Sequence, residues 1–158
     1  MSDPVFDVVA GHPFTSGLDA HHVNQLASMA REMCFETGSV IFPEGDHSRE
    51  FYLLVHGMVA LEICSGSSQH RFQTLYANDE FGWSALMPDK GKLLQARALE
   101  RVDVLVFDGP QLQAAFQNDP AFGLTITTRL LGVVAERLDV ARGQLVDLYS
   151  TESRRAGT

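Results

Sequence analysis

The hydrophobic positions of the chain change their spacing twice, and these changes predict three blocks of structure. Residues 1–17 precede the first block as an N-terminal extension broken by prolines and glycines. The first block begins at Asp19, a favourable N-terminal cap, and its apolar residues follow helical spacing to about Met33. The apolar positions of this predicted helix are Val23, Leu26, Ala27, Ala30 and Met33.

In the second block, from Gly38 to about Phe107, short β-type runs alternate with turn residues. Short strands at this regular spacing predict a compact antiparallel sandwich or barrel. Gly45 and Gly57 lie in two of the turns, where a positive φ favours glycine. The predicted strands cover residues 40–42, 51–55, 59–64, 72–76, 93–98 and 102–107.

The third block returns to helical spacing. Asp108 can cap a short helix over residues 109–117, and Asn118-Asp119-Pro120 ends it. A long helix then runs from about Ala121 to Tyr149. Residues 150–158 are polar, and we expect them to form a frayed tail.

The long helix carries two separate apolar faces. One face repeats every seven residues with a second position three residues later, which predicts a coiled-coil seam and a homodimer. The alternative is a single broad stripe that faces the core without a partner. A second row, formed by Ile126, Leu130, Val133 and Val140, is expected to face the β block. The seam consists of Leu124, Thr127, Leu131, Val134, Leu138, Ala141, Leu145 and Leu148.

Composition narrows the classes of function. The chain has 158 residues, 45% of them apolar, which predicts one globular domain with an ordinary core. Its formal net charge of −8 argues against direct nucleic-acid binding, because phosphate contact needs a basic face. We find neither a signal-peptide pattern nor a membrane-spanning run, and only two cysteines. We therefore expect a cytoplasmic protein that does not contact membranes.

The residue types that carry catalysis do not form a recognised motif. The chain lacks a Gly-x-Ser-x-Gly elbow, a Walker loop and a His-Glu-x-x-His pattern. Its six histidines and two cysteines show no metal-ligand spacing. We therefore expect a protein that is not an enzyme and holds no metal.

Two stretches of the β block and one loop combine glycine turns with apolar strand residues in a specific order. The stretches are Gly38-x-x-Ile41-Phe42-x-Glu44-Gly45-Asp46 and Phe51-Tyr52-Leu53-Leu54-Val55-x-Gly57-x-Val59-x-Leu61, and the loop is Phe81-Gly82-Trp83-Ser84-Ala85-Leu86-Met87.

In these residues and in its order of elements, the chain resembles the cyclic nucleotide-binding domains of the Crp/Fnr type. The resemblance implies an antiparallel, jelly-roll-like β-roll, flanked by an N-terminal helix and a long C-terminal helix. It covers residues 18–149 and leaves no room there for a DNA-binding helix-turn-helix module. It also implies a regulatory role, in which a bound ligand shifts the helices that follow the roll.

The loop corresponds to the family's phosphate-binding cassette with one departure. Phe81 and Gly82 match, and residues 84–87 resemble the short helical turn whose backbone amides face the cyclic phosphate. Trp83 stands where the family places a glutamate that accepts a hydrogen bond from the ribose 2′-hydroxyl.

The family's next ligand-binding pair, an arginine followed by serine or threonine, is also altered. One alignment places Lys92 and Leu93 at these positions. An alternative takes Arg97-Ala98, but it shortens the following strand, so we favour the first. On the long helix, the polar positions that reach the base in nucleotide-responsive relatives align near Ala141 and Arg142.

These departures predict weak or absent binding of ordinary cyclic AMP and cyclic GMP. One unmade hydrogen bond to a buried ligand group costs about 1–3 kcal/mol, and each 1.4 kcal/mol is about tenfold in affinity. Trp83 either lines a pocket for another ligand, apolar or anionic, or fills a vestigial cavity. Lys92 and Arg97 either attract an anion or are solvated strand residues. The predicted pocket residues are Phe81, Gly82, Trp83, Ser84, Ala85, Leu86, Lys92, Leu93, Leu94 and Arg97.

We therefore expect a regulatory sensor domain that acts on an unidentified partner protein. The expected ligand is a cyclic nucleotide or another small apolar or anionic molecule. The alternative function is a dimeric interaction module that needs no ligand.

Overall fold

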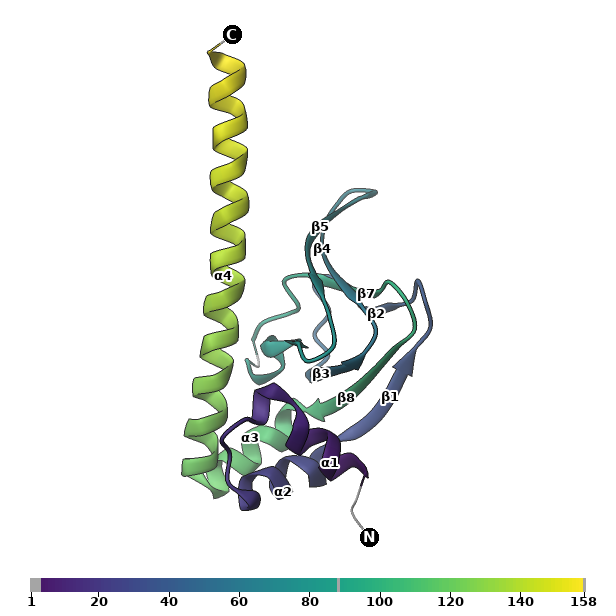
Figure 1. Cartoon of the computed structure of the whole chain (residues 1–158), viewed down its shortest axis with the longest axis vertical. Helices are drawn as coiled ribbons and strands as arrows, with labels where there is room; N and C mark the ends of the chain where they lie inside the picture. Colours follow the sequence, from purple (N-terminus) through teal and green to yellow (C-terminus); the bar gives the residue numbers. More distant parts are fainter. Residues whose placement is uncertain (1–3, 88, 158) are drawn as a thin grey trace.

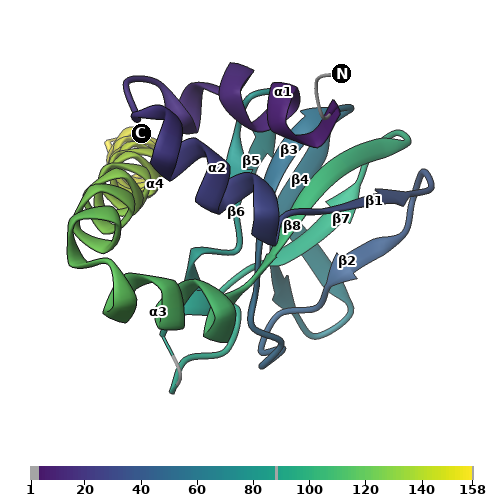
Figure 2. The same ribbon diagram turned by 90° about the horizontal axis from the view of Figure 1, so that it is seen from below.

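A computed structural model describes residues 4–87 and 89–157 of the chain. Strands from the middle of the sequence form a β-roll, and helices from both ends of the sequence pack against one side of it (Figures 1 and 2). The last helix is much longer than the roll and runs past it (Figure 1).

The helices lie before and after the strands in sequence, and one short 3₁₀ turn lies between two of the strands. They are α1 (Pro4–Gly11), a 3₁₀ turn η1 (Pro13–Thr15), α2 (Ala20–Met29), a 3₁₀ turn η2 (Trp83–Leu86), α3 (Gly109–Asn118) and α4 (Pro120–Ala156). The strands are β1 (Arg31–Phe35), β2 (Val40–Phe42), β3 (Glu50–His56), β4 (Val59–Ser65), β5 (Ser68–Leu75), β6 (Glu80–Phe81), β7 (Gln95–Ala98) and β8 (Val102–Asp108).

Two four-stranded antiparallel sheets make the roll, with strand orders β1-β8-β3-β6 and β2-β7-β4-β5. Alternating residues of both sheets point inward and form one apolar cluster that includes Leu54, Val59 and Val104. Within this cluster the rings of Tyr52 and Phe81 stack with their centroids 4.8 Å apart. The predicted β-roll flanked by an N-terminal helix and a long C-terminal helix is confirmed.

A second apolar cluster lies between the helices and the outer face of the β3–β8 pair. Phe51 and Phe107 contribute the strand side of this cluster. Ile126, Leu130 and Val133 of α4 contribute to its helical side, so three of the four residues of the predicted second apolar row face the core. Val140, the fourth, is half-buried and lies outside this cluster.

Residues of the N-terminal extension also enter this second cluster. Val9 and Phe14 are buried in it, and the Phe14 ring lies 5.4 Å from that of Phe51. Arg129 of α4 donates to the Phe14 carbonyl at 3.2 Å. The extension is thus packed onto the fold from α1 onward.

The predicted end of the first helix was wrong. Helix α2 ends at Met29, because Ala30 adopts an extended backbone with ψ of 138°. Met33 lies instead in β1, where it pairs with Val104. Four of the five residues of β1 are exposed, so this strand lacks the alternation of apolar and polar positions that predicts strands.

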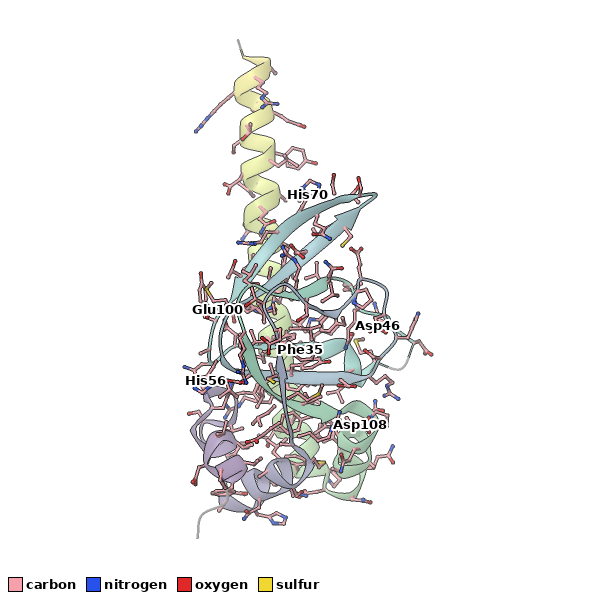
Figure 3. All side chains as sticks on the ribbon, turned by 90° about the vertical axis from the view of Figure 1, so that its right-hand side faces the viewer. Phe35, Asp46, His56, His70, Glu100 and Asp108 are labelled. Atoms are coloured by element: carbon pink, nitrogen blue, oxygen red, sulfur yellow. The ribbon has the colours of Figure 1, made fainter. Side chains whose placement is uncertain are left out.

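The long helix also differs from its prediction at the C-terminal end. It does not fray after Tyr149 but continues to Ala156. Its N-terminus is capped by Asp119, whose carboxylate accepts from the Phe122 backbone amide at 3.2 Å. His70, near the tip of the β4–β5 hairpin, marks where the roll ends, and α4 continues well beyond it (Figure 3).

His12 connects the N-terminal segment to the roll. It is buried, its Nε2 donates to the Leu54 carbonyl at 3.3 Å, and its Nδ1 accepts from the Phe14 amide at 3.2 Å. Both bonds require a neutral ring with its proton on Nε2. Burial lowers the pKa of His12 below its ordinary value of 6.5, against an opposing effect of the Leu54 carbonyl and Asp79.

This lowered pKa predicts a loss of stability in acid. Because the unfolded chain binds the proton more readily, the free energy of unfolding should be highest above pH 6.5 and fall as the pH drops through 6.5 toward the folded pKa. Urea unfolding from about pH 5 to about pH 8 measures the slope. His12→Gln should flatten it, whereas His70→Gln, at an exposed position, should not; equal slopes in all three proteins would contradict the prediction.

Candidate ligand-binding pocket

The cassette loop begins with a backbone turn that only glycine accommodates. Gly82 follows β6 with φ of 82°. A Cβ atom on this residue would lie 2.8 Å from the Glu50 carbonyl oxygen and 3.2 Å from the Tyr52 ring. Glycine therefore allows the loop to lie directly against β3 before η2 begins.

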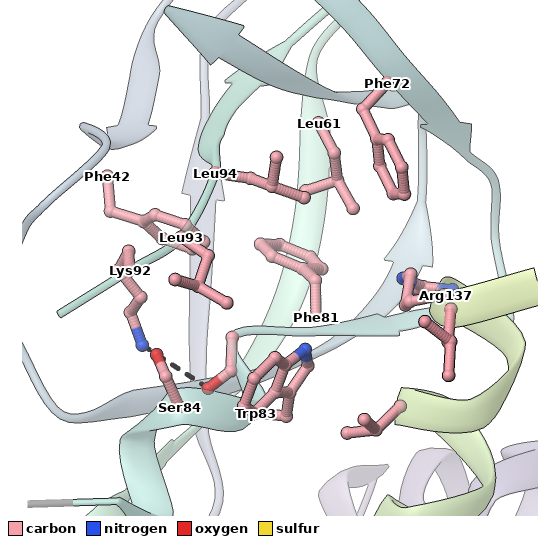
Figure 4. A pocket seen from close by; sticks show the side chains of 13 residues that line it. Phe42, Leu61, Phe72, Phe81, Trp83, Ser84, Lys92, Leu93, Leu94 and Arg137 are labelled. Carbon is pink, nitrogen blue, oxygen red and sulfur yellow. Dashed lines mark hydrogen bonds between the residues drawn. The ribbon is translucent and has the colours of Figure 1, made fainter. Parts of the chain in front are cut away.

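A pocket of about 370 Å³ opens beside η2. Its walls come from the roll, from the cassette and from α4, so elements far apart in sequence enclose it (Figure 4). This volume lies at the small end of the range for small-molecule sites. The lining residues are Phe42, Leu61, Phe72, Phe81, Gly82, Trp83, Ser84, Lys92, Leu93, Leu94, Val134, Arg137 and Leu138.

Trp83 forms part of this wall and also touches the helical core. Its side chain is half-buried and packs against the cluster that contains Ala85 and Phe107. The indole lies on the pocket side of η2, between Ser84 and α4 (Figure 4). Because the pocket remains open beside it, Trp83 does not fill the cavity. An indole offers a hydrogen-bond donor and no acceptor, unlike the glutamate of the family pattern.

Lys92 is a buried residue at the pocket wall, not a solvated one. It is 3% exposed. Its Nζ donates to the carbonyls of Glu50 at 3.0 Å and Gly82 at 3.3 Å, and it lies 5.1 Å from the centroid of the Phe42 ring. Burial lowers the pKa of Lys92 to about 8, while Asp46 and Glu50 oppose the shift. Lys92 thus fastens the start of the cassette to β3.

Arg137 is a second buried cation at the pocket, and sequence reasoning did not identify it. It is 8% exposed, and its Nη2 donates to the Glu80 carbonyl at 2.6 Å. Burial raises the pKa of the Glu80 carboxyl to about 7, and the Arg137 charge opposes this. Arg137 directly precedes the seam residue Leu138, and only the position of α4 against the roll brings it to the pocket.

Three of the predicted pocket residues lie outside this wall. Ala85 is fully buried in the helical core, and Leu86 packs against the same cluster. Arg97 turns to the neighbouring strand and forms two hydrogen bonds with Glu62, at 3.0 and 2.7 Å. These bonds, together with one from Gln95, lower the pKa of the Glu62 carboxyl against the effect of its burial.

On α4, the contacts with the pocket occur earlier than expected. Val134, Arg137 and Leu138 line it, whereas Ala141 and Arg142 do not. Val134 and Leu138 were predicted only for the dimer seam. Phe42, Leu61 and Phe72 were also missed, because inward-facing strand residues do not indicate from sequence which of them border a cavity.

Neither a metal cluster nor a membrane span is found in the described part of the chain. No group of three or more His, Cys, Asp or Glu side chains there could hold a metal ion. No helix among these residues is long and apolar enough to cross a membrane.

Comparison with known proteins agrees with this architecture. The sequence profile of the cyclic nucleotide-binding domain matches residues 32–119, more than half of the chain. The chain belongs to the cyclic nucleotide-binding domain family. The fold of the chain is that of solved members of this family.

The chain is similar to a protein of about its own length and to longer proteins. A putative cyclic nucleotide-binding protein from Geobacter metallireducens GS-15 is 28% identical, with a TM-score of 0.73, over 87% of this chain and 99% of that chain. The catabolite activator protein of Thermus thermophilus is 25% identical, with a TM-score of 0.71, over 87% of this chain and 63% of that chain. The cAMP-dependent protein kinase regulatory subunit of Blastocladiella emersonii is 26% identical over 125 residues, 78% of this chain. The chain spans 25–32% of the length of three curated relatives.

Substitution of Gly82 tests the close approach that forms the pocket floor. Gly82→Ala should lower the free energy of unfolding through both the left-handed backbone and the contact with the Glu50 carbonyl. Gly38→Ala is a matched control, because Gly38 has φ of 86° and a Cβ atom there would meet nothing within 4 Å. The control should lose about 1–2 kcal/mol, and Gly82→Ala about 1–3 kcal/mol more, in urea unfolding. Equal losses would show that the cassette tolerates a side chain.

Proposed function

We propose that this chain is a non-enzymatic regulatory domain whose pocket binds a small molecule other than ordinary cyclic AMP or cyclic GMP. The observation that carries the proposal is Trp83, an indole on the pocket wall where the family pattern has a carboxylate. The pocket is open, so it can hold a ligand. Its polar groups differ from those that a ribose cyclic phosphate needs.

The polar inventory of the pocket supports a loss of nucleotide affinity. None of the described lining residues carries a carboxylate to accept from a ribose hydroxyl. At the arginine position, Lys92 offers a point charge instead of a two-pronged donor, and two of its three N–H groups already bind carbonyls. Leu93 offers no hydroxyl. Each missing interaction weakens binding by about 1–3 kcal/mol.

Isothermal titration calorimetry with cyclic AMP and cyclic GMP tests this proposal. The three lost interactions together predict affinities at least about a hundredfold weaker than a micromolar site, and therefore no saturable heat at micromolar concentrations. Trp83→Glu restores an acceptor and should tighten binding relative to the unaltered protein. Saturable micromolar binding of either nucleotide by the unaltered protein would sink the proposal.

We propose in addition that the chain forms a homodimer through α4. The leucines of the predicted seam project from the helix into solvent, with Leu124 71% and Leu131 68% exposed, whereas Val134 and Ala141 are half-buried. Leu145 and Leu148 extend the same row beyond the roll. An exposed apolar row of this length is costly in water, and a parallel copy of the helix would cover it.

A shared helix would connect the two proposed activities. Val134 and Leu138 belong to the seam and also line the pocket. A ligand that favours one position of α4 would therefore favour one geometry of the dimer, which a partner protein could recognise.

A dimeric interaction module without a ligand is the second candidate. The observation in its favour is the row of exposed leucines along the seam. Two copies of the helix could pair through these leucines whether or not the pocket holds a ligand. A thermal-shift screen separates the two functions, because a module without a ligand should show no stabilisation by cyclic nucleotides, aromatic acids or fatty acids.

Charged substitutions in the seam test the dimer. Leu124→Asp combined with Leu131→Asp should yield monomers in size-exclusion chromatography with light scattering, because each charge would be buried against its copy. Both positions are exposed in the single chain, so its melting temperature at high dilution should change little. Gly132→Asp with Gly143→Asp adds the same charge on α4 where a Cβ atom meets nothing within 4 Å, and should leave the dimer intact. A dimer that survives the leucine substitutions would disprove the seam.

A further inference from the structure

The pocket combines apolar walls with two buried cations and no described lining carboxylate. Figure 4 places Lys92 and Arg137 at opposite ends of the pocket, with Phe81 and Leu94 between them. A buried positive charge without a paired anion is costly, so such a pocket favours a ligand that carries negative charge.

The two cations differ in how many of their donors are already occupied. Two of the three N–H groups of Lys92 bind the carbonyls of Glu50 and Gly82. The guanidinium of Arg137 has five N–H groups, and Glu80 O is the one hydrogen-bond acceptor that the described residues offer it. Arg137 is nevertheless more than nine-tenths buried. Its other N–H groups have no acceptor among the described residues, and their nitrogens are not fully buried, so they remain available to a ligand in the pocket that Arg137 lines.

The Glu80 carboxylate, which interacts electrostatically with Arg137, does not take up these donors. Glu80 contacts Arg137 through its backbone carbonyl, and its side chain is not among the pocket-lining residues. Burial keeps the pKa of that carboxyl near 7, so it is only partly ionised at neutral pH. Glu136 and Asp79 lie near Glu80 and disfavour its ionisation further.

The rest of the pocket fits a flat apolar body. Phe72, Phe81 and Trp83 contribute aromatic faces or edges, and Leu61 and Leu94 complete the wall (Figure 4). Aromatic ligands pack on such surfaces by offset stacking or edge contacts. The volume of about 370 Å³ suits a small molecule with a single ring or with two fused rings.

We propose that the pocket binds a small aromatic carboxylate, whose carboxylate pairs with Arg137 of α4 and whose ring lies among Phe72, Phe81 and Trp83. This rests on the proposed function, in that the pocket must be a ligand site. The planar guanidinium can donate two parallel bonds to a carboxylate, which a lysine cannot. The anion would then be held by the helix that carries the seam, and not by the cassette.

Titration calorimetry with 2-naphthoate and its neutral amide, 2-naphthamide, tests this proposal. The two probes share their rings and differ in charge. The unaltered protein should bind the acid at least about tenfold more tightly, because a charge-assisted pair in a buried site contributes about 1.5–3 kcal/mol. Equal affinities for the two probes would overturn the role of Arg137 while leaving the pocket as a ligand site.

Three variants test whether Arg137 causes the preference for the acid over the amide. Arg137→Gln keeps an amide donor for the Glu80 carbonyl and should lose the preference for the acid. Arg137→Lys keeps the charge and should retain a smaller preference, which preserves the test if the glutamine variant does not fold. Arg142→Gln removes an exposed arginine from the same helix and should leave the preference unchanged.

Two other results would contradict the proposed aromatic carboxylate site. If Lys92→Met loses the preference and Arg137→Gln keeps it, the anion is held at the cassette and the proposal is wrong. If neither probe binds, the aromatic carboxylate is wrong as the ligand class. The proposed function stands apart from both results, because micromolar binding of cyclic AMP would overturn it whatever the naphthalene probes do.

Discussion

The structure of the pocket depends on one buried ammonium group. Lys92 donates to the carbonyl of Glu50 on β3 and to that of Gly82 at the start of the cassette, and so holds the two segments together. Gly82 makes this possible, because a side chain there would separate the loop from β3. The cation thus has a structural task, and its lowered pKa reflects the cost of burying it. This commitment supports the proposal that the pocket does not bind an ordinary cyclic phosphate.

Helix α4 unites features that would otherwise be separate. One face completes the helical core through Ile126, Leu130 and Val133. The adjacent face contributes Arg137 to the pocket wall, and the leucines of the seam are exposed to solvent. A rigid helix cannot move one of these faces alone, so any displacement at the pocket would be transmitted along its whole length. In the proposed function, α4 would therefore carry the response to a ligand.

The fold could be predicted from sequence because its strongest strands alternate cleanly and its turns require glycine. Strands β1 and β6 were missed for different reasons: the first is exposed along most of its length, and the second has two residues. The anomaly at Trp83 was visible because it interrupts a recognisable loop. The place of Arg137 at the pocket could not be predicted, because it depends on how α4 is rotated against the roll. Helical spacing in the sequence does not determine that rotation. Arg97 was assigned to the pocket for its charge, yet it pairs with the buried Glu62 on the adjacent strand.

Trp83 is the only tryptophan of the chain, and it lies on the pocket wall in contact with the helical core. Its fluorescence therefore originates from a single site, and a change in the polarity around the indole will appear in the emission spectrum without a label. The same substitution that removes the family's ribose acceptor thus supplies the domain with a built-in optical reporter of its own cavity.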